Sequence, residues 1–102
     1  MCISIYNSGS MYNWRDKPVF LDHKRNVDSE MIECDIDFEI ILETLDNGVE
    51  VKIRKADIIE KWHQIGKSII IVTIEDYDDY WLIRHVGRIK ATKKKLKLMR
   101  GG

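Results

Sequence analysis

Hydrophobic and acidic residues alternate along residues 32–40, and apolar side chains continue at every second position as far as Leu42. Strict alternation of this kind is the period of a β-strand with one buried face. Asn47-Gly48 follows, and residues 49–54 then alternate again between aliphatic and charged side chains. Asn-Gly between two alternating runs favours a tight hairpin turn, because both central residues must adopt positive φ. The pattern predicts a β-hairpin over residues 32–54.

A short helix is predicted next, over about residues 57–65. Asp57 and Glu60 stand at the two positions of a capping box, and Gly66 is placed to end the helix in a left-handed conformation. The apolar residues between these signals recur at helical spacing: they are Ile58, Trp62 and Ile65.

Two further strands are predicted after the helix. Residues 68–74 form a nearly continuous β-branched run, which is typical of a strand buried on both faces. Residues 80–86 read as another strand beyond an acidic turn, with a bulge or bend expected at Gly87. Residues 92–99 alternate only weakly.

The predicted fold is therefore a single, strand-dominated α+β domain that spans residues 1–102. It consists of a twisted antiparallel sheet or small open barrel with one short helix. Residues 31–102 supply the sheet and the helix. Residues 1–30 form an irregular N-terminal segment that packs on this body, with a weak strand near Ile3 and an edge strand after Pro18.

Composition narrows the class of protein. The chain has 102 residues, 44% of them hydrophobic, and two cysteines, which favours one small core rather than a disulfide framework. The longest uncharged apolar run, residues 69–74, is far too short to span a membrane. No signal peptide is apparent. We expect a cytoplasmic protein that has no membrane contact.

The formal net charge of zero hides a sharp split. Residues 1–83 carry all 17 acidic residues and nine basic ones, whereas residues 84–102 carry eight basic residues and no acidic one. Such asymmetry is a reason to consider contact with nucleic acid or with a membrane surface, or pairing between the acidic and basic parts of the chain itself. Tyr80 and Trp81 precede the basic run and could stack on bases. The residues expected to contact phosphates are Arg84, Arg88, Lys90, Lys93, Lys94, Lys95, Lys97 and Arg100.

A plainer interpretation of the lysines is that they keep an edge strand soluble. The acidic side chains also allow an alternative function, in which a small inhibitor, for example one encoded by a bacteriophage, occupies the basic groove of a protein that handles nucleic acid. The residues expected to form this acidic face are Glu33, Asp35, Asp37, Glu39, Asp76, Asp78 and Asp79. A sheet with exposed edges can also pair with a second copy, so the sequence allows a homodimer.

No motif for catalysis or for a cofactor is present. The sequence Gly66-Lys67-Ser68 lacks the upstream glycine of a phosphate-binding loop. No two of the potential soft metal ligands have the close-pair spacing of a zinc site: these ligands are Cys2, Cys34, His23, His63 and His85. The sequence therefore predicts a binding module that is not an enzyme, with neither a metal nor a cofactor.

The last seven residues, Leu96 to Gly102, resemble the end of ubiquitin, where a final strand leads into an Arg-Gly-Gly tail. A hairpin followed by a helix, as predicted above, is also the order in ubiquitin-like proteins. This resemblance implies a third class, a peptide modifier in which Gly102 would provide the activated carboxylate.

Overall fold

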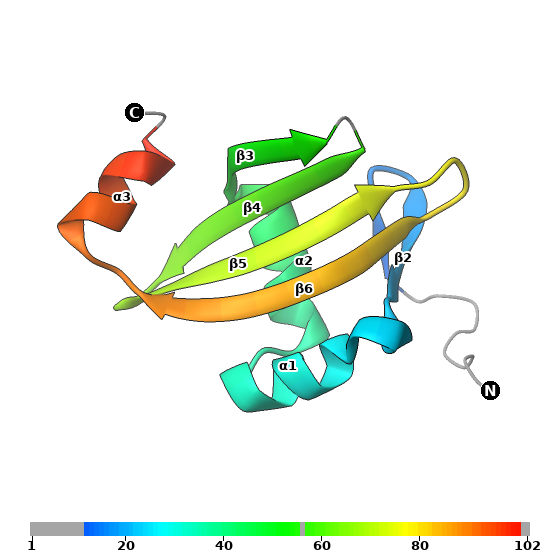
Figure 1. Cartoon of the computed structure of the whole chain (residues 1–102), viewed down its shortest axis with the longest axis horizontal. Helices are drawn as coiled ribbons and strands as arrows, with labels where there is room; N and C mark the ends of the chain where they lie inside the picture. Colours follow the sequence, from blue (N-terminus) through cyan, green and yellow to red (C-terminus); the bar gives the residue numbers. More distant parts are fainter. Residues whose placement is uncertain (1–11, 56, 101–102) are drawn as a thin grey trace.

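The computed structural model describes residues 12–55 and 57–100 and contains one sheet with helices packed against it (Figure 1). In chain order the elements are β1 (Asn13–Trp14), β2 (Lys17–Leu21), the 3₁₀ helix η1 (His23–Arg25), α1 (Val27–Cys34), α2 (Phe38–Asn47), β3 (Val49–Lys55), β4 (Ile58–Ile65), β5 (Ser68–Asp76), β6 (Trp81–Lys90) and α3 (Lys93–Met99).

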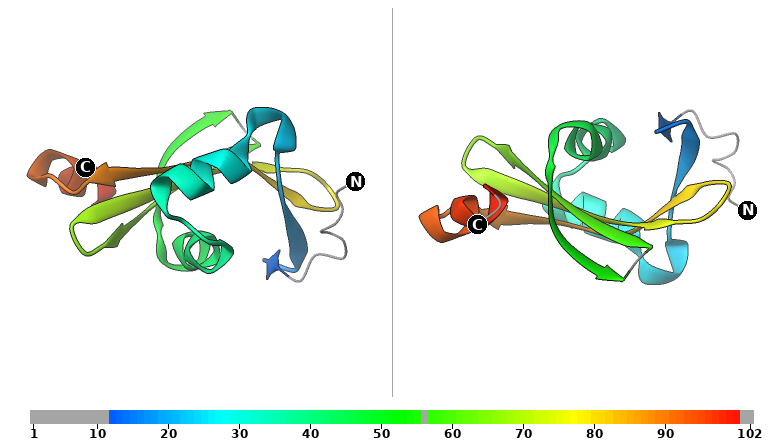
Figure 2. Two further views of the ribbon diagram at one scale, coloured as in Figure 1. Left: turned by 90° about the horizontal axis from the view of Figure 1, so that it is seen from below. Right: turned by 90° about the horizontal axis from the view of Figure 1, so that it is seen from above.

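The six strands form one mixed sheet in the order β1-β2-β6-β5-β4-β3. All neighbouring strands are antiparallel except β2 and β6, which run parallel. The sheet curls around α2, which lies on its concave face (Figure 2). The expected fold class, a small strand-dominated α+β domain with an open, curled sheet, is confirmed. The structure differs from the expectation in its parallel strand pair, in having three α-helices among the described residues instead of one, and in which segments form helices and strands.

The main hydrophobic core lies between the concave face of the sheet and the helices. Alternate residues of β5 and β6 point into it, and α1 and α2 close it from the other side. Trp14 and Trp81 lie together at one end of this core, with ring centroids 4.9 Å apart. The buried members are Trp14, Val19, Val27, Ile36, Ile41, Leu45, Ile70, Val72, Ile74, Trp81, Ile83 and Val86.

The first half of the predicted hairpin is wrong, because residues 27–47 form α1 and α2. The side chains that face the core follow helical spacing: Phe38, Ile41 and Leu45 in α2 lie three and four residues apart. Ile32 belongs to the alternating set but is 82% exposed. The alternation was misleading because a helix needs only some of these apolar residues on its inner face.

Polar residues at the ends of the two helices reinforce this structure. Asp37 is the N-cap of α2, and its side chain accepts a hydrogen bond from the amide of Ile40 at 2.9 Å. Asp35 ends α1 with φ 57°, in the left-handed conformation that Asp tolerates well. Gly48 caps α2 with φ −73° instead of forming a type I′ turn. The second half of the predicted hairpin is confirmed as β3.

The helix predicted over residues 57–65 is also wrong, because this segment is strand β4. It pairs with β5 without interruption from Ile58 to Ile65. Both faces of β4 carry buried side chains, so its apolar positions do not alternate cleanly. The turn after it consists of two residues, Gly66 and Lys67. Gly66 has a positive φ, as the first residue of a type II′ hairpin turn requires.

Elsewhere the outcome is mixed. The strands predicted at residues 68–74 and 80–86 are confirmed as β5 and β6, and the strand after Pro18 as β2. The bulge lies at Arg84 and not at Gly87, because Thr73 pairs with His85 while Ile74 pairs with Ile83. The weak strand near Ile3 lies outside the described residues.

Helix α1 covers the part of the β6 edge that β2 leaves open, since β2 pairs with β6 only at residues 81–83. Glu30 accepts a hydrogen bond from the free backbone amide of Val86 at 3.1 Å. Arg88 donates to the carbonyls of Cys34 and Asp35, at 2.8 and 3.0 Å, at the end of α1. These contacts satisfy both the strand edge and the helix C-terminus.

Candidate nucleic-acid interface

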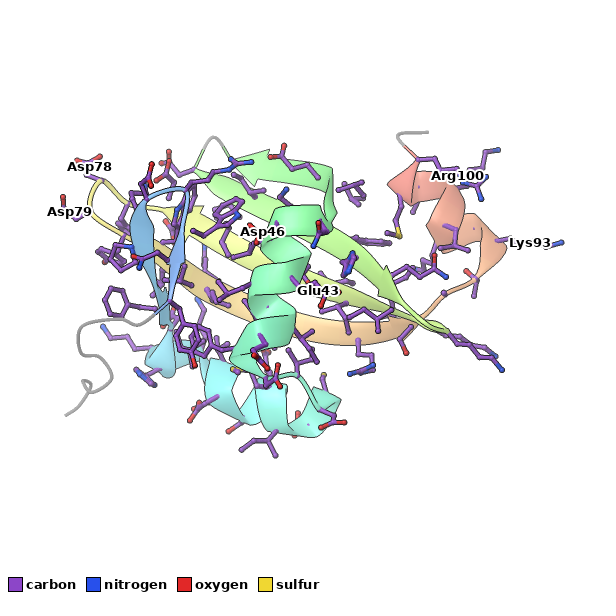
Figure 3. All side chains as sticks on the ribbon, turned by 180° about the vertical axis from the view of Figure 1, so that it is seen from behind. Glu43, Asp46, Asp78, Asp79, Lys93 and Arg100 are labelled. Carbon is purple, nitrogen blue, oxygen red and sulfur yellow. The ribbon has the colours of Figure 1, made fainter. Side chains whose placement is uncertain are left out.

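The basic end of the chain forms helix α3, where the sequence showed only a weak alternation over residues 92–99. Thr92 caps α3, accepting a hydrogen bond from the amide of Lys95 at 3.2 Å. The amide of Ala91 donates to the carbonyl of Lys67 at 2.9 Å and fixes the start of the helix to the β4–β5 turn. Lys93 and Arg100, which bracket α3, both point away from the body of the molecule (Figure 3).

One side of α3 is held against the sheet. The ammonium of Lys95 lies 5.9 Å from the centroid of the Trp62 ring. Leu96 and Met99 are half-buried. Trp62 lies on the convex face of the sheet yet is only 7% exposed. Helix α3 therefore attaches to the sheet through its apolar side chains and Lys95, and turns its other lysines outward.

The remaining basic residues form what we call the basic terminal surface. Each is exposed, and none forms an ion pair with an acidic side chain among residues 12–51 and 57–100. Its members are Lys90, Lys93, Lys94, Lys97 and Arg100.

The distribution of charge in α3 opposes helix formation. Lys93, Lys94 and Lys95 occupy the first turn, where the helix dipole favours acidic side chains. Lys97 follows Lys93 by four residues and repels it. Helical stability therefore does not account for the lysines of the first turn, which are available for an external anion.

Two arginines predicted to contact nucleic acid have partners within the molecule. Arg84 lies 3.5 Å from the carboxylate of Glu75. Arg88 holds the end of α1 through its bonds to Cys34 and Asp35. The structure therefore brings together five of the eight predicted basic residues on one exposed surface, and uses Arg84, Arg88 and Lys95 in packing.

The two aromatic residues expected to stack on bases lie at the other end of β6, which spans about 30 Å at strand rise. Trp81 is 5% exposed, and its indole N–H donates to the carbonyl of Trp14 at 2.9 Å. Tyr80 stacks on Tyr77 with centroids 4.9 Å apart, and its edge meets Phe20. These rings are therefore separate from the basic terminal surface.

The acidic residues form two groups and not one row. Asp76, Asp78 and Asp79 belong to the end of β5 and the turn that follows, at the end of the molecule opposite α3 (Figure 3); Asp76 pairs with Lys17. The second group surrounds the corner between α1 and α2. It comprises Glu33, Asp35, Asp37 and Glu39.

The α1–α2 corner contains a feature that the sequence did not reveal. A groove of about 700 Å³ opens there, with apolar walls that include Met31 and the highly exposed Ile32. Phe38 also lines it, stacked on Tyr12 with ring centroids 4.3 Å apart. No sequence signal could have located the groove while this segment was interpreted as a strand.

A second cleft, of about 460 Å³, lies over β4, β5 and β6. Its three basic side chains each have a carboxylate partner: Arg25 with Asp22 at 3.2 Å, His85 with Glu30 at 3.3 Å, and Arg84 with Glu75. The positive charges of Arg25 and Arg84 are therefore already compensated, which makes this cleft a weaker anion site than the basic terminal surface.

Other chemistry has little structural support. Among the described residues, no three His, Cys, Asp or Glu side chains converge on a position that could hold a metal ion. No helix in the same residues is long and apolar enough to cross a membrane. Leu96 to Met99 are helical, unlike the final strand that the ubiquitin resemblance implied, and Gly101 and Gly102 lie outside the described residues.

Lys61 is the one buried lysine among the described side chains. It is 7% exposed, and its ammonium lies 3.4 Å from the carbonyl oxygen of Gly48 and 5.6 Å from the Trp14 ring centroid. Burial lowers the pKa of Lys61, and the neighbouring Arg15 lowers it further. The charged form is therefore destabilised in the folded protein.

We expect Lys61→Met to change how stability depends on pH. The pKa of Lys61 is lower in the folded chain than its usual 10.5. The unfolded chain therefore binds more protons, and wild-type stability rises as pH increases between these two pKa values. The variant lacks this rise. Urea unfolding from about pH 7 upward measures this rise, with the exposed Lys24→Met as control. Parallel dependences of stability on pH for wild type and Lys61→Met would contradict the lowered pKa of Lys61.

Comparison of the chain with models of protein families, with curated proteins and with solved structures finds no match to any of them.

Proposed function

We propose that this protein is a non-enzymatic binding module that contacts the phosphate backbone of nucleic acid through the basic terminal surface. The observation that carries the proposal is the set of five exposed cationic side chains at one end of the molecule, none of which forms an ion pair within residues 12–51 and 57–100. When such groups neutralise phosphates, they release condensed counterions. The resulting affinity does not depend on the base sequence of the nucleic acid.

The arrangement favours contact with the backbone over readout of bases. Lysine is a flexible point charge. Arg100 is the single arginine of this surface, and it is the residue suited to bidentate contacts with a base. Tyr80 and Trp81 are distant from it. We therefore expect binding without base stacking, and without strong preference among sequences.

The test is the binding of two unrelated labelled duplexes of about 20 base pairs, and of their single strands, followed by fluorescence anisotropy at about 50 mM salt. We expect micromolar dissociation constants that agree within about threefold between sequences, as is typical of non-specific binding. Absence of binding up to about 100 µM protein, which is the weak end of that range, would contradict the proposal.

A matched control is available in Lys24→Glu. Lys24 is exposed in η1 and its charge change equals that of any single reversal in α3. We expect its affinity to stay close to that of wild type, because the contribution of a charge depends on its proximity to phosphate. A loss equal to that from a reversal in α3 would show that only net charge matters.

A further inference from the structure

The groove at the α1–α2 corner combines an apolar surface with a negative rim. Met31, Ile32 and Phe38 supply apolar walls, and the three carboxylates that line the groove are Asp28, Asp35 and Asp37. Ile32 is 82% exposed, the largest exposed fraction among the exposed large hydrophobic residues of the described chain. An apolar patch with a charged rim is typical of a surface that binds another protein segment.

The segment that fits this groove is basic and carries exposed apolar side chains. Helix α3 has this composition: Leu98 is 42% exposed and lies one helical turn from Lys94. Lys97 is also exposed beside it. The chain therefore carries both a groove with a negative rim and a positively charged helix whose exposed side contains a leucine.

The two surfaces do not meet within one molecule. Helix α3 lies beyond the end of the sheet, away from the corner between α1 and α2 (Figures 1 and 3). We propose that α3 of one copy docks in the α1–α2 groove of a second copy, with Leu98 against Ile32 and the lysines against the carboxylates. The formal net charge of zero favours this contact, since two copies do not repel each other overall.

A reciprocal arrangement follows from the symmetry of the contact. Each copy has one helix and one groove, so a two-fold dimer makes two contacts, whereas a single helix of seven residues buries little area. We expect association that is weak and sensitive to salt, because its ion pairs lie at an exposed rim.

Sedimentation analysis of the full chain without nucleic acid tests this inference independently of the proposed function. At about 50 mM salt the average mass should rise with protein concentration toward twice that of the monomer, and at about 500 mM salt the rise should largely disappear. A mass that stays monomeric up to about 1 mM protein would overturn the proposal. That result would leave the groove to an unrelated protein.

Two variants sharpen the test by complementation. Ile32→Asp disables the groove and, because the side chain is exposed, should leave the fold intact. Lys94→Glu with Lys97→Glu disables the helix. Each alone should weaken self-association about tenfold or more. A mixture of the two should associate more strongly than either variant alone but more weakly than wild type, because the mixed dimer keeps one of the two contacts, α3 of the first variant in the groove of the second.

Lys24→Glu is the matched control for charge and should associate like wild type. Circular dichroism of each variant checks that α1 and α3 are folded.

Two outcomes would overturn the proposal even if wild type dimerises. One is association unaffected by Ile32→Asp. The other is a mixture that associates no more strongly than either variant alone, since pairing through sheet edges or between two α3 helices cannot be restored in this way.

Discussion

Reversal of charge at Lys93, Lys94 and Lys97 together is expected to weaken nucleic-acid binding by about a thousandfold, if each lost charge-assisted contact contributes roughly tenfold. These three side chains belong to the basic terminal surface and have no acidic partner among residues 12–51 and 57–100. Glutamate at the same positions also repels phosphate. Anisotropy titration at low salt measures the loss.

The fold should survive this change. All three lysines are exposed. Glutamate at residues 93 and 94, in the first turn of α3, agrees with the helix dipole better than lysine does, and this offsets the less favourable glutamate at residue 97 in the last turn. The urea midpoint of the triple variant should therefore equal or exceed that of wild type. A loss of affinity of less than twofold, in a variant that is folded, would contradict the assignment of this surface.

Gly48→Ala is expected to have the largest effect on stability, about 3 kcal/mol, because it adds an atom to a tightly packed position. A Cβ at residue 48 would lie 2.4 Å from the carbonyl oxygen of Thr44 and 2.8 Å from that of Trp62. Both are backbone atoms of packed elements, and neither can move away as a flexible side chain can. The φ of −73° is ordinary, so the effect is steric.

Gly87→Ala provides the matched control. A Cβ at Gly87 would meet no atom within 4 Å, so the same chemical change should alter the free energy of unfolding by less than about 0.5 kcal/mol. Urea denaturation of the two variants beside wild type gives the comparison. Equal midpoints for all three proteins would show that β4 does not approach the end of α2 as closely as described.

Local sequence predicted those elements whose pattern fits only one structure. The β-branched run of β5 is too rich in isoleucine and valine for an exposed helix. The strand pattern continues in β6, beyond an acidic turn. Residues 32–42 failed because their apolar residues fit both a strand period and a helix with one apolar face. The decisive signals were local but weaker, such as Asp37 as an N-cap three residues before Ile40.

The candidate site was predictable only in part, for a similar reason. The cluster of positive charge after residue 83 is visible in the sequence. Which of its members are free depends on contacts between distant segments: Arg88 reaches residues more than 50 positions earlier in the chain, and the indole of Trp81 reaches Trp14. The α1–α2 groove depends on how two helices meet, and no local pattern encodes that.

The most direct test of the central claim is the dependence of the dissociation constant on salt for duplex DNA. If the five side chains of the basic terminal surface each neutralise one phosphate, log K should fall with log[salt] with a slope of about −4.5. Binding would then weaken more than a hundredfold between about 50 and 200 mM salt. A slope near zero would contradict the account, because it would mean that affinity arises without phosphate contacts from this surface.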